Sequence, residues 1–243
     1  MSLDPKTIRE VARQTEVLRA PKQTVSSFGL TAVEYYLLSE PVYGELLPGS
    51  GDVPGESAGQ GQRETVVRVG LITSERPQIV TPYYLLNLFR GFAHGEEFAQ
   101  HLHKAYGPHA PGFMYSYRND LKETSIVSDP LPVVAGRLSD QLDQRGEALA
   151  AVIRGVDHLW DVSLMKFIFE LTVQSLGQNV ADLGRMGLLG QERGLPKAVR
   201  ARLDDMFAAV TGGELNPAEL KAELDRWGVF AEYEDRFLDL FRR

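Results

Sequence analysis

Four of the five histidines lie close together in the sequence: His94, His101, His103 and His109. If a helix runs through this segment, His94, Glu97 and His101 occupy positions i, i+3 and i+7 and share one helix face. Two imidazoles and a carboxylate on one face could ligate a divalent metal ion. The spacing therefore predicts a candidate metal site and, with it, a divalent-metal-dependent enzyme of the hydrolase or oxidase type. It also fits exposed histidines on the polar face of an amphipathic helix, and both interpretations stay open.

A second set of chemical groups is His158 with Asp161, one helical turn further along. A histidine whose imidazole is oriented by a carboxylate can act as a general base, so these two residues are the catalytic candidates. The alternative is a buried core histidine that is hydrogen-bonded to a neighbouring carbonyl. No reaction follows from this pair alone.

A third set is Tyr115, Tyr117 and Arg118. On a strand, the two tyrosines lie on the same face, where they could stack on a base while the guanidinium neutralises a phosphate. This arrangement predicts a nucleotide-binding or small-metabolite-binding protein. Packing of the two tyrosines inside the protein, followed by a polar turn, is the alternative.

The composition restricts the function classes. The chain has 243 residues, 43% of them hydrophobic, and no cysteine, which excludes disulfides, thiolate zinc sites and thiol nucleophiles. A net charge of −7 disfavours binding to nucleic acid. The sequence lacks the long apolar run of a membrane span, and its charged N-terminal segment is not typical of a secretion signal. We expect a soluble cytoplasmic protein that does not associate with membranes.

Side-chain caps followed by proline mark four predicted helix starts: Asp4-Pro5, Thr81-Pro82, Asp129-Pro130 and Asn216-Pro217. Proline loses no hydrogen bond at the first helical position, so each pair favours a helix beginning there. The last start is strengthened by Glu219, which has the spacing of a capping box, and Gly228 should end that helix.

The N-terminal half combines helical and strand patterns. Apolar spacing predicts a helix over residues 5–19. Between the strands at 33–38 and 65–73, the glycine-rich residues 48–62 predict a mobile loop without the pattern of a phosphate-binding motif. The predicted antiparallel sheet consists of four segments rich in β-branched and aromatic residues: 33–38, 65–73, 113–117 and 125–127. A further short strand is predicted at 78–80.

The C-terminal half reads as helix almost throughout. Residues 147–176 carry two apolar faces, which predicts a central helix packed on both flanks. Two further helices, 217–227 and 231–242, form a predicted hairpin. The predicted fold class is therefore α+β and predominantly helical, with a small antiparallel sheet in residues 1–129 and a helical bundle around the central helix in residues 130–243.

A helix-rich chain without a convergent set of reactive groups favours a binding function, and the aromatic hairpin at the C-terminal end supports it. Trp227, Phe230, Phe237 and Phe241 offer more apolar surface than a short hairpin can bury within itself. They must pack against the rest of the chain or against another protein. We therefore expect a non-catalytic protein-binding or regulatory module, acting with a protein partner or as a homo-oligomer, for instance a homodimer.

Overall fold

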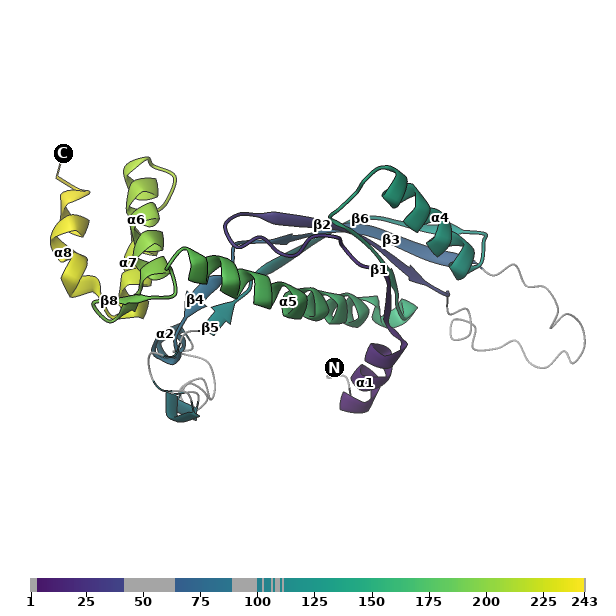
Figure 1. The fold of residues 1–243 in the computed structure, drawn as a ribbon, viewed down its shortest axis with the longest axis horizontal. Coiled ribbons are helices and arrows are strands. Elements are labelled where there is room, and N and C mark those ends of the chain that lie inside the picture. Colours follow the sequence, from purple (N-terminus) through teal and green to yellow (C-terminus); the bar gives the residue numbers. More distant parts are fainter. Residues whose placement is uncertain are drawn as a thin grey trace, which may run out of the picture. The chain divides into compact units, whose positions relative to one another are not determined.

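The computed structural model describes residues 4–41, 64–88, 100–101, 103–105, 107, 110 and 112–242. They form two compact units, each made of two separate stretches of the chain (Figure 1). Unit 1 comprises Met1–Arg76 and Tyr115–Asn179, and unit 2 comprises Pro77–Met114 and Val180–Arg243. The boundary expected at residues 129/130 lies within unit 1, because strands from both halves of the chain pair there.

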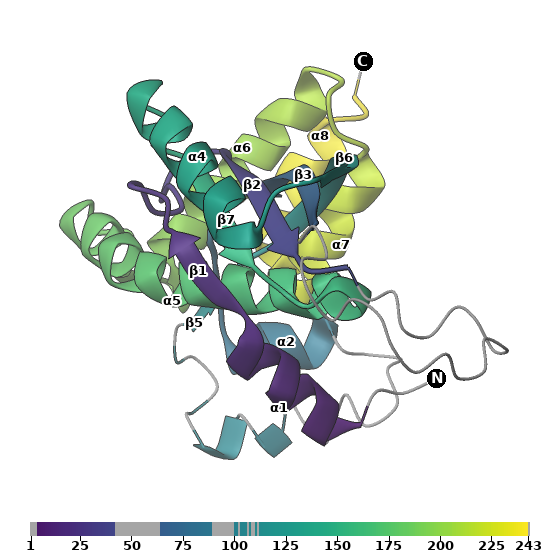
Figure 2. The same ribbon diagram turned by 90° about the vertical axis from the view of Figure 1, so that its right-hand side faces the viewer.

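Unit 1 is built on a five-stranded mixed sheet in the order β1-β7-β2-β3-β6. β7 runs parallel to β2, and the other neighbouring strands are antiparallel. The strands are β1 (Glu16–Arg19), β2 (Thr31–Ser39), β3 (Thr65–Ser74), β6 (Tyr117–Val127) and β7 (Ala150–Arg154). The helix α1 (Pro5–Gln14) leads directly into β1, which lies at one edge of the sheet (Figure 2).

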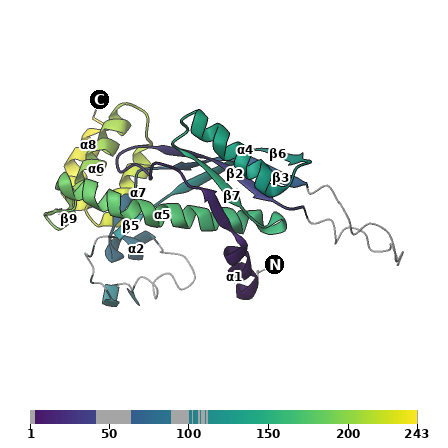
Figure 3. The same cartoon turned by 45° about the vertical axis from the view of Figure 1, so that its right-hand side comes forward.

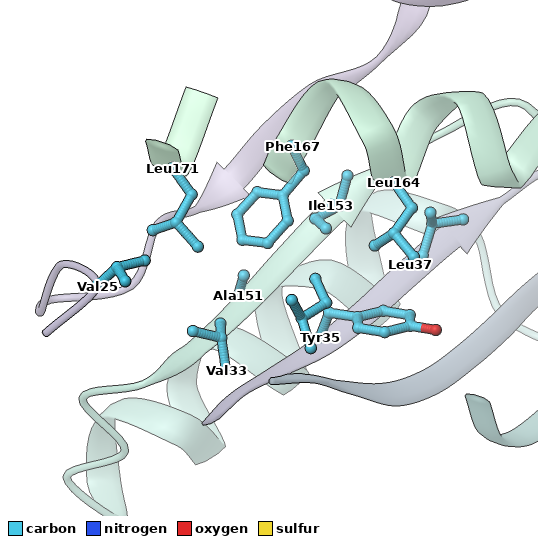
Figure 4. Packing of buried hydrophobic residues seen from close by; sticks show 10 residues of the cluster. Val25, Val33, Tyr35, Leu37, Ala151, Ile153, Leu164, Phe167 and Leu171 are labelled. Atoms are coloured by element: carbon cyan, nitrogen blue, oxygen red, sulfur yellow. The ribbon is translucent and has the colours of Figure 1, made fainter. Parts of the chain in front are cut away.

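A helix covers each face of this sheet (Figure 3). Alternation along β2 directs Val33, Tyr35 and Leu37 towards one face and Leu38 towards the other. The first group packs against α5 (Trp160–Arg185), as Figure 4 shows, and Leu38 packs against α4 (Leu131–Gln144). Each fully buried side chain of this kind contributes about 1.5–3 kcal/mol, so these two clusters are the main stabilising feature of unit 1.

Unit 2 is mainly helical, with short strand pairs. Its core gathers Tyr84, Leu203, Phe207, Leu224 and Trp227. The helices of unit 2 that the structure describes from end to end are α2 (Pro82–Leu88), α6 (Lys197–Thr211), α7 (Pro217–Trp227) and α8 (Phe230–Asp239). β4 (Gln78–Val80) pairs with β5 (Gly112–Met114), and β8 (Gln191–Glu192) pairs with β9 (Leu195–Pro196).

Three of the four predicted helix starts are confirmed with their caps. Asn216 accepts a hydrogen bond from the backbone N–H of Ala218 at 2.9 Å, and Asp4 and Thr81 cap α1 and α2 in the same way. Gly228 ends α7 with φ 68°, a left-handed conformation that favours glycine. At the fourth start, Asp129 instead forms an ion pair with Arg137 in the second turn of α4.

The predicted fold class is wrong: the protein is mixed α/β rather than predominantly helical with a small antiparallel sheet. The correction comes from β7, which lies inside the segment expected to be the central helix. Ala150 to Ile153 are all buried between α4 and α5, so the strand has no polar alternation. A strand that is buried on both faces has the same continuous apolar pattern as a buried helix, and length alone distinguishes them.

The predicted central helix over 147–176 is also wrong. α5 begins only at Trp160, and one of its two apolar faces is exposed. Within the residues that the structure describes, no helix combines the length and the hydrophobicity needed to cross a membrane.

Smaller differences concern the element ends. The helix expected over 5–19 ends at Gln14, where the Thr15 hydroxyl bonds the Val11 carbonyl at 2.8 Å and the chain continues as β1. The strand expected over 113–117 divides into β5 and the start of β6. The predicted mobile loop at 48–62 lies outside the described residues.

Candidate functional site

The carboxyl ends of the parallel strands β2 and β7 open into a cavity of about 780 Å³ in unit 1. This edge of an α/β sheet is where loops following parallel strands most often form ligand sites. The charged and titratable side chains that line it are Arg13, Glu16, Glu40, Arg154, Asp157 and His158. Two arginines, three carboxylates and one histidine line it, so neither sign of charge dominates the cavity.

Two hydrogen-bonded groups fix the loop between β7 and α5. Asp157 Oδ1 forms an ion pair with Arg68 Nη1 at 2.8 Å and accepts a hydrogen bond from Ser39 Oγ at 2.9 Å. Ser39 is fully buried, and the Arg68 guanidinium lies 5.6 Å from the centre of the Trp160 ring, close enough for a cation–π contact. Because three neighbours hold Arg68, the Asp157 carboxylate keeps a defined position at the cavity wall.

The second group joins the same loop to α1. The hydroxyls of Ser163 and Thr15 are hydrogen-bonded at 2.8 Å, and Ser163 Oγ accepts from the backbone N–H of Val156 at 3.2 Å. Gly155 passes so close to α5 that an added Cβ would lie 2.8 Å from Ser163 Cβ. Only glycine therefore fits where β7 ends.

The structure separates the two predicted catalytic residues. His158 is exposed in the short 3-10 helix Asp157–Leu159 at the cavity, which contradicts the expectation of a buried core histidine. Asp161 Oδ1 accepts from the backbone N–H of Val162 at 2.9 Å, so this carboxylate stabilises the start of α5. Among the described residues no hydrogen bond joins His158 to Asp161.

The two predicted ligand-binding tyrosines point into unit 1. Tyr115 donates to Asn179 Oδ1 at 2.7 Å, and the Tyr117 hydroxyl lies 2.7 Å from Thr172 Oγ1. Their rings are stacked at 6.4 Å, and burial raises the pKa of Tyr115 to about 12. Both hydroxyls thus fasten the start of β6 to α5. Arg118 is exposed and, as the next residue on the strand, points to the other face.

Most of the candidate metal site lies outside the described residues. This applies to His94 and Glu97, whereas His101 is an exposed helical residue. In the part of the chain that the structure describes, no group of three or more His, Asp or Glu side chains could hold a metal ion. The site therefore stays a prediction.

One catalytic motif in the sequence is outside the predicted candidates. Residues 55–59 match the Gly-x-Ser-x-Gly pattern of a hydrolase nucleophile elbow, with Ser57 at its centre. That elbow joins a strand directly to a helix. The described elements on either side of residues 42–63 are β2 and β3, which pair with each other. The flanking structure thus does not supply the context that would support the motif, and residues 55–59 themselves lie outside the described residues.

The feature of unit 1 that most needs an explanation is the outer face of α5, formed by Met165, Phe169, Val173 and Leu176. Their exposed fractions are 57%, 68%, 56% and 41%. The spacing i, i+4, i+8 and i+11 places them in one row on the helix. The opposite side of the same helix is buried, with Leu164, Phe167 and Leu171 at 3% exposure or less. The sequence predicts a buried apolar face of Val162, Met165, Phe169, Val173 and Leu176, and of these five only Val162 is buried.

The surroundings of the outer face of α5 are weakly charged. Residues 171–179 contain no charged side chain, and at the other end Lys166 forms an ion pair with Glu170 at 2.8 Å. The segment before β2 is bound to this part of α5, since Asn179 Nδ2 donates to the Val25 carbonyl at 2.8 Å. That segment carries two more exposed apolar side chains, Phe28 and Leu30.

Two other surfaces are less suited to binding. β6 is a long edge strand, but it carries the exposed charges Arg118, Asp120 and Lys122 and a bulge at Lys122, features that oppose edge-to-edge pairing. In the C-terminal hairpin, Trp227 and Phe237 are buried within unit 2, and Phe241 is exposed at 59%. The hairpin therefore buries most of its aromatic surface inside its own unit.

Comparison with known proteins adds no functional information. No family model matches the chain, and no curated protein or solved structure is significantly similar to it. The geometry of the described residues is thus the only basis for a functional proposal.

Proposed function

We propose that this chain is a non-catalytic protein-binding module and that its binding surface is the outer face of α5. The observation that carries this proposal is a row of four large apolar side chains, 41–68% exposed, on a helix whose other side is buried. Apolar surface in water is unfavourable, and burying one such side chain fully stabilises a complex by about 1.5–3 kcal/mol. The absence of cysteine fits a cytoplasmic location for this module.

The contiguity of the row supports the proposal. Single exposed apolar residues are common on protein surfaces, but contiguous patches of about 300–600 Å² are the largest on a typical monomer and often have a function. Phe169 is the most exposed member and lies in the middle of the row. A large aromatic side chain at the centre of an interface commonly contributes most to affinity.

The test is site-specific photo-crosslinking in the source cells. A photo-reactive phenylalanine analogue replaces Phe169 in one variant and the exposed Glu123 of β6 in a matched control. We expect a discrete protein adduct at position 169 only. The protein identified by mass spectrometry should then bind the purified chain and should not bind its Val173→Asp variant. Equal labelling at both positions would contradict the proposal.

A second candidate function is favoured by the cavity at the carboxyl ends of β2 and β7. We infer that it could hold a small anionic metabolite, because the exposed Arg154 guanidinium makes no ion pair among the described residues and His158 lies on the same wall. The test is a thermal-shift screen with inorganic phosphate and nucleotides. A stabilisation that is lost in Arg154→Ala but kept in Arg9→Ala, a control in α1, is the expected result. No shift with any anion removes this candidate.

A further inference from the structure

A smaller pocket in unit 2, the Arg193 pocket, lies between the β8–β9 hairpin and the junction of α7 with α8. Its volume is about 200 Å³, and its apolar lining residues include Leu195, Trp227 and Val229. Among the described residues that line it, Arg193 alone carries a charge. A cavity of roughly 150 Å³ can hold benzene, whereas sites for whole metabolites usually span about 300–1,000 Å³. The pocket therefore has the size for one ring-sized group.

Arg193 has a backbone conformation that its own turn does not favour. Its φ is 48°, and it is the one residue other than glycine with a positive φ in the described part of the chain. With Gly194 it forms the two-residue loop between β8 and β9, and such a loop prefers asparagine, aspartate or glycine at its first position. A Cβ makes this conformation unfavourable. The turn thus does not explain an arginine here, and strained residues of this kind are often found at functional sites.

A second arginine holds this turn in place. Arg200 Nε donates to the Glu192 carbonyl at 2.9 Å, and its Nη2 donates to the Arg193 carbonyl at 3.3 Å. Its Nη1 donates to Glu232 Oε1 at 2.8 Å and to the Tyr233 hydroxyl at 3.0 Å. The Arg200 side chain is only 12% exposed. The strained backbone is therefore stabilised by the surrounding structure, which fixes the position of Arg193 at the pocket.

The guanidinium of Arg193 is only loosely bound within the protein. Its Nη1 lies 3.7 Å from Glu232 Oε1, and the side chain is 77% exposed. Glu232 already has a closer partner in Arg200. An exposed ion pair of this length contributes little to stability. Because two arginines share one carboxylate, a net positive charge remains beside the pocket.

We propose that the Arg193 pocket binds a small carboxylic acid with a ring-sized apolar group. The apolar group contacts Leu195, Trp227 and Val229, and the carboxylate pairs with the Arg193 guanidinium. A guanidinium matches the geometry of a carboxylate, which can accept two parallel hydrogen bonds from it. A single lining cation suits an anion with one charge. This site belongs to unit 2 and does not depend on the binding surface proposed on α5.

Titration with benzoate tests the pocket, because Trp227 lines it and reports binding by fluorescence in a Trp160→Phe background. We expect a saturable change with a millimolar or lower dissociation constant. Benzamide, which is neutral and has nearly the same shape, should bind at least tenfold more weakly. N-acetylglycylphenylalanine carries the same two groups at the end of a peptide. If it binds more tightly than phenylpropionate, the acid is a chain end, and if more weakly, it is a free metabolite. No saturable change with benzoate, or equal binding of benzamide, would overturn the proposal.

Arg193→Gly separates binding from stability. Glycine relieves the positive φ, so the urea midpoint of unit 2 should equal or exceed that of the parent, while the benzoate dissociation constant rises at least tenfold. Arg242→Ala removes another exposed arginine of unit 2, with 76% exposure, and should change neither quantity. Unchanged benzoate binding by the Arg193→Gly chain would overturn the proposal. A lower midpoint would overturn it as well, because the arginine would then serve the stability of the turn.

Discussion

Glu223 in α7 is the charged hub of unit 2, and its replacement by glutamine gives the sharpest prediction about stability. The side chain is 2% exposed. Its Oε1 accepts from Trp227 Nε1 at 3.2 Å and pairs with Arg202 at 3.3 Å. Its Oε2 accepts from the Tyr84 hydroxyl at 3.2 Å and from Arg226 at 3.0 Å. The carboxylate thus ties α2, α6 and α7 together.

The magnitude follows from what Glu223→Gln removes. Glutamine keeps the volume but replaces one oxygen by a donor, so it cannot accept from both arginines. Each hydrogen bond to a charged group contributes about 1.5–3 kcal/mol, and a buried ion pair that loses one partner costs about 3–5 kcal/mol. The side chains of Arg202 and Arg226 are 26% and 40% exposed, so water can solvate them in part. We expect unit 2 to lose about 2–3 kcal/mol of its free energy of unfolding.

The two tryptophans make the assay specific, since Trp160 lies in unit 1 and Trp227 in unit 2. In a Trp160→Phe background, urea unfolding followed by fluorescence reports unit 2. Glu223→Gln should lower the midpoint of that transition, whereas the exposed control Glu234→Gln in α8 should leave it unchanged. A Glu223→Gln midpoint equal to that of the parent would refute the reasoning.

Three further predictions concern unit 1 and the histidine segment. Gly155→Ala forces a Cβ to 2.8 Å from Ser163 Cβ, so it should lower the free energy of unfolding of unit 1 by about 1–3 kcal/mol, measured by Trp160 fluorescence in urea. The control Gly177→Ala, at a position with open space around it, should be neutral or stabilising. An unchanged midpoint for Gly155→Ala would contradict the packing argument. Burial raises the pKa of Tyr115 from 10.0 to about 12, so the stabilisation that its neutral hydroxyl provides is complete below pH 10 and is lost as the pH rises towards 12. Tyr115→Phe should remove one late-titrating phenol from the ultraviolet titration. The same substitution should make the stability of the protein fall less steeply between pH 10 and pH 12. Equilibration with zinc, manganese or iron tests the metal site predicted at His94, Glu97 and His101. The site is established if one ion binds per chain and His101→Ala abolishes the binding. Sub-stoichiometric metal in every case removes the site.

The ends of several helices and strands could be predicted from the sequence, because the interactions that determine them involve residues only a few positions apart. Asn216 and Gly228 delimit α7 through interactions that the neighbouring residues determine. Strands with clear composition, such as β2 and β3, were located within two residues at each end. These features do not depend on what packs against them.

Features that depend on tertiary packing could not be predicted in the same way. The apolar run at 150–153 became a strand because β2 and β1 supply its hydrogen bonds, and no residue within the run specifies that. The apolar residues of α5 were identified, but the sequence does not tell which of the two rows a sheet will cover. The cavity wall forms only when β1, β7 and β2 pair in the observed register, which the sequence does not specify. A local signal for it existed in Gly155 and Asp157, which directly follow a buried apolar run.

The parallel pairing of β2 with β7 also determines when unit 1 can be completed during synthesis. Glu34 is the partner of Ala150, so the strand that closes the sheet leaves the ribosome more than a hundred residues after the strand that receives it. During that interval β2 can pair with β3, but its other edge has no native partner, and the segment 77–114 of unit 2 has already emerged. Such long-range pairing slows folding and leaves an open strand edge in the nascent chain. Nascent chains that are halted before residue 150 should therefore bind chaperones, and those extended beyond α5 should release them.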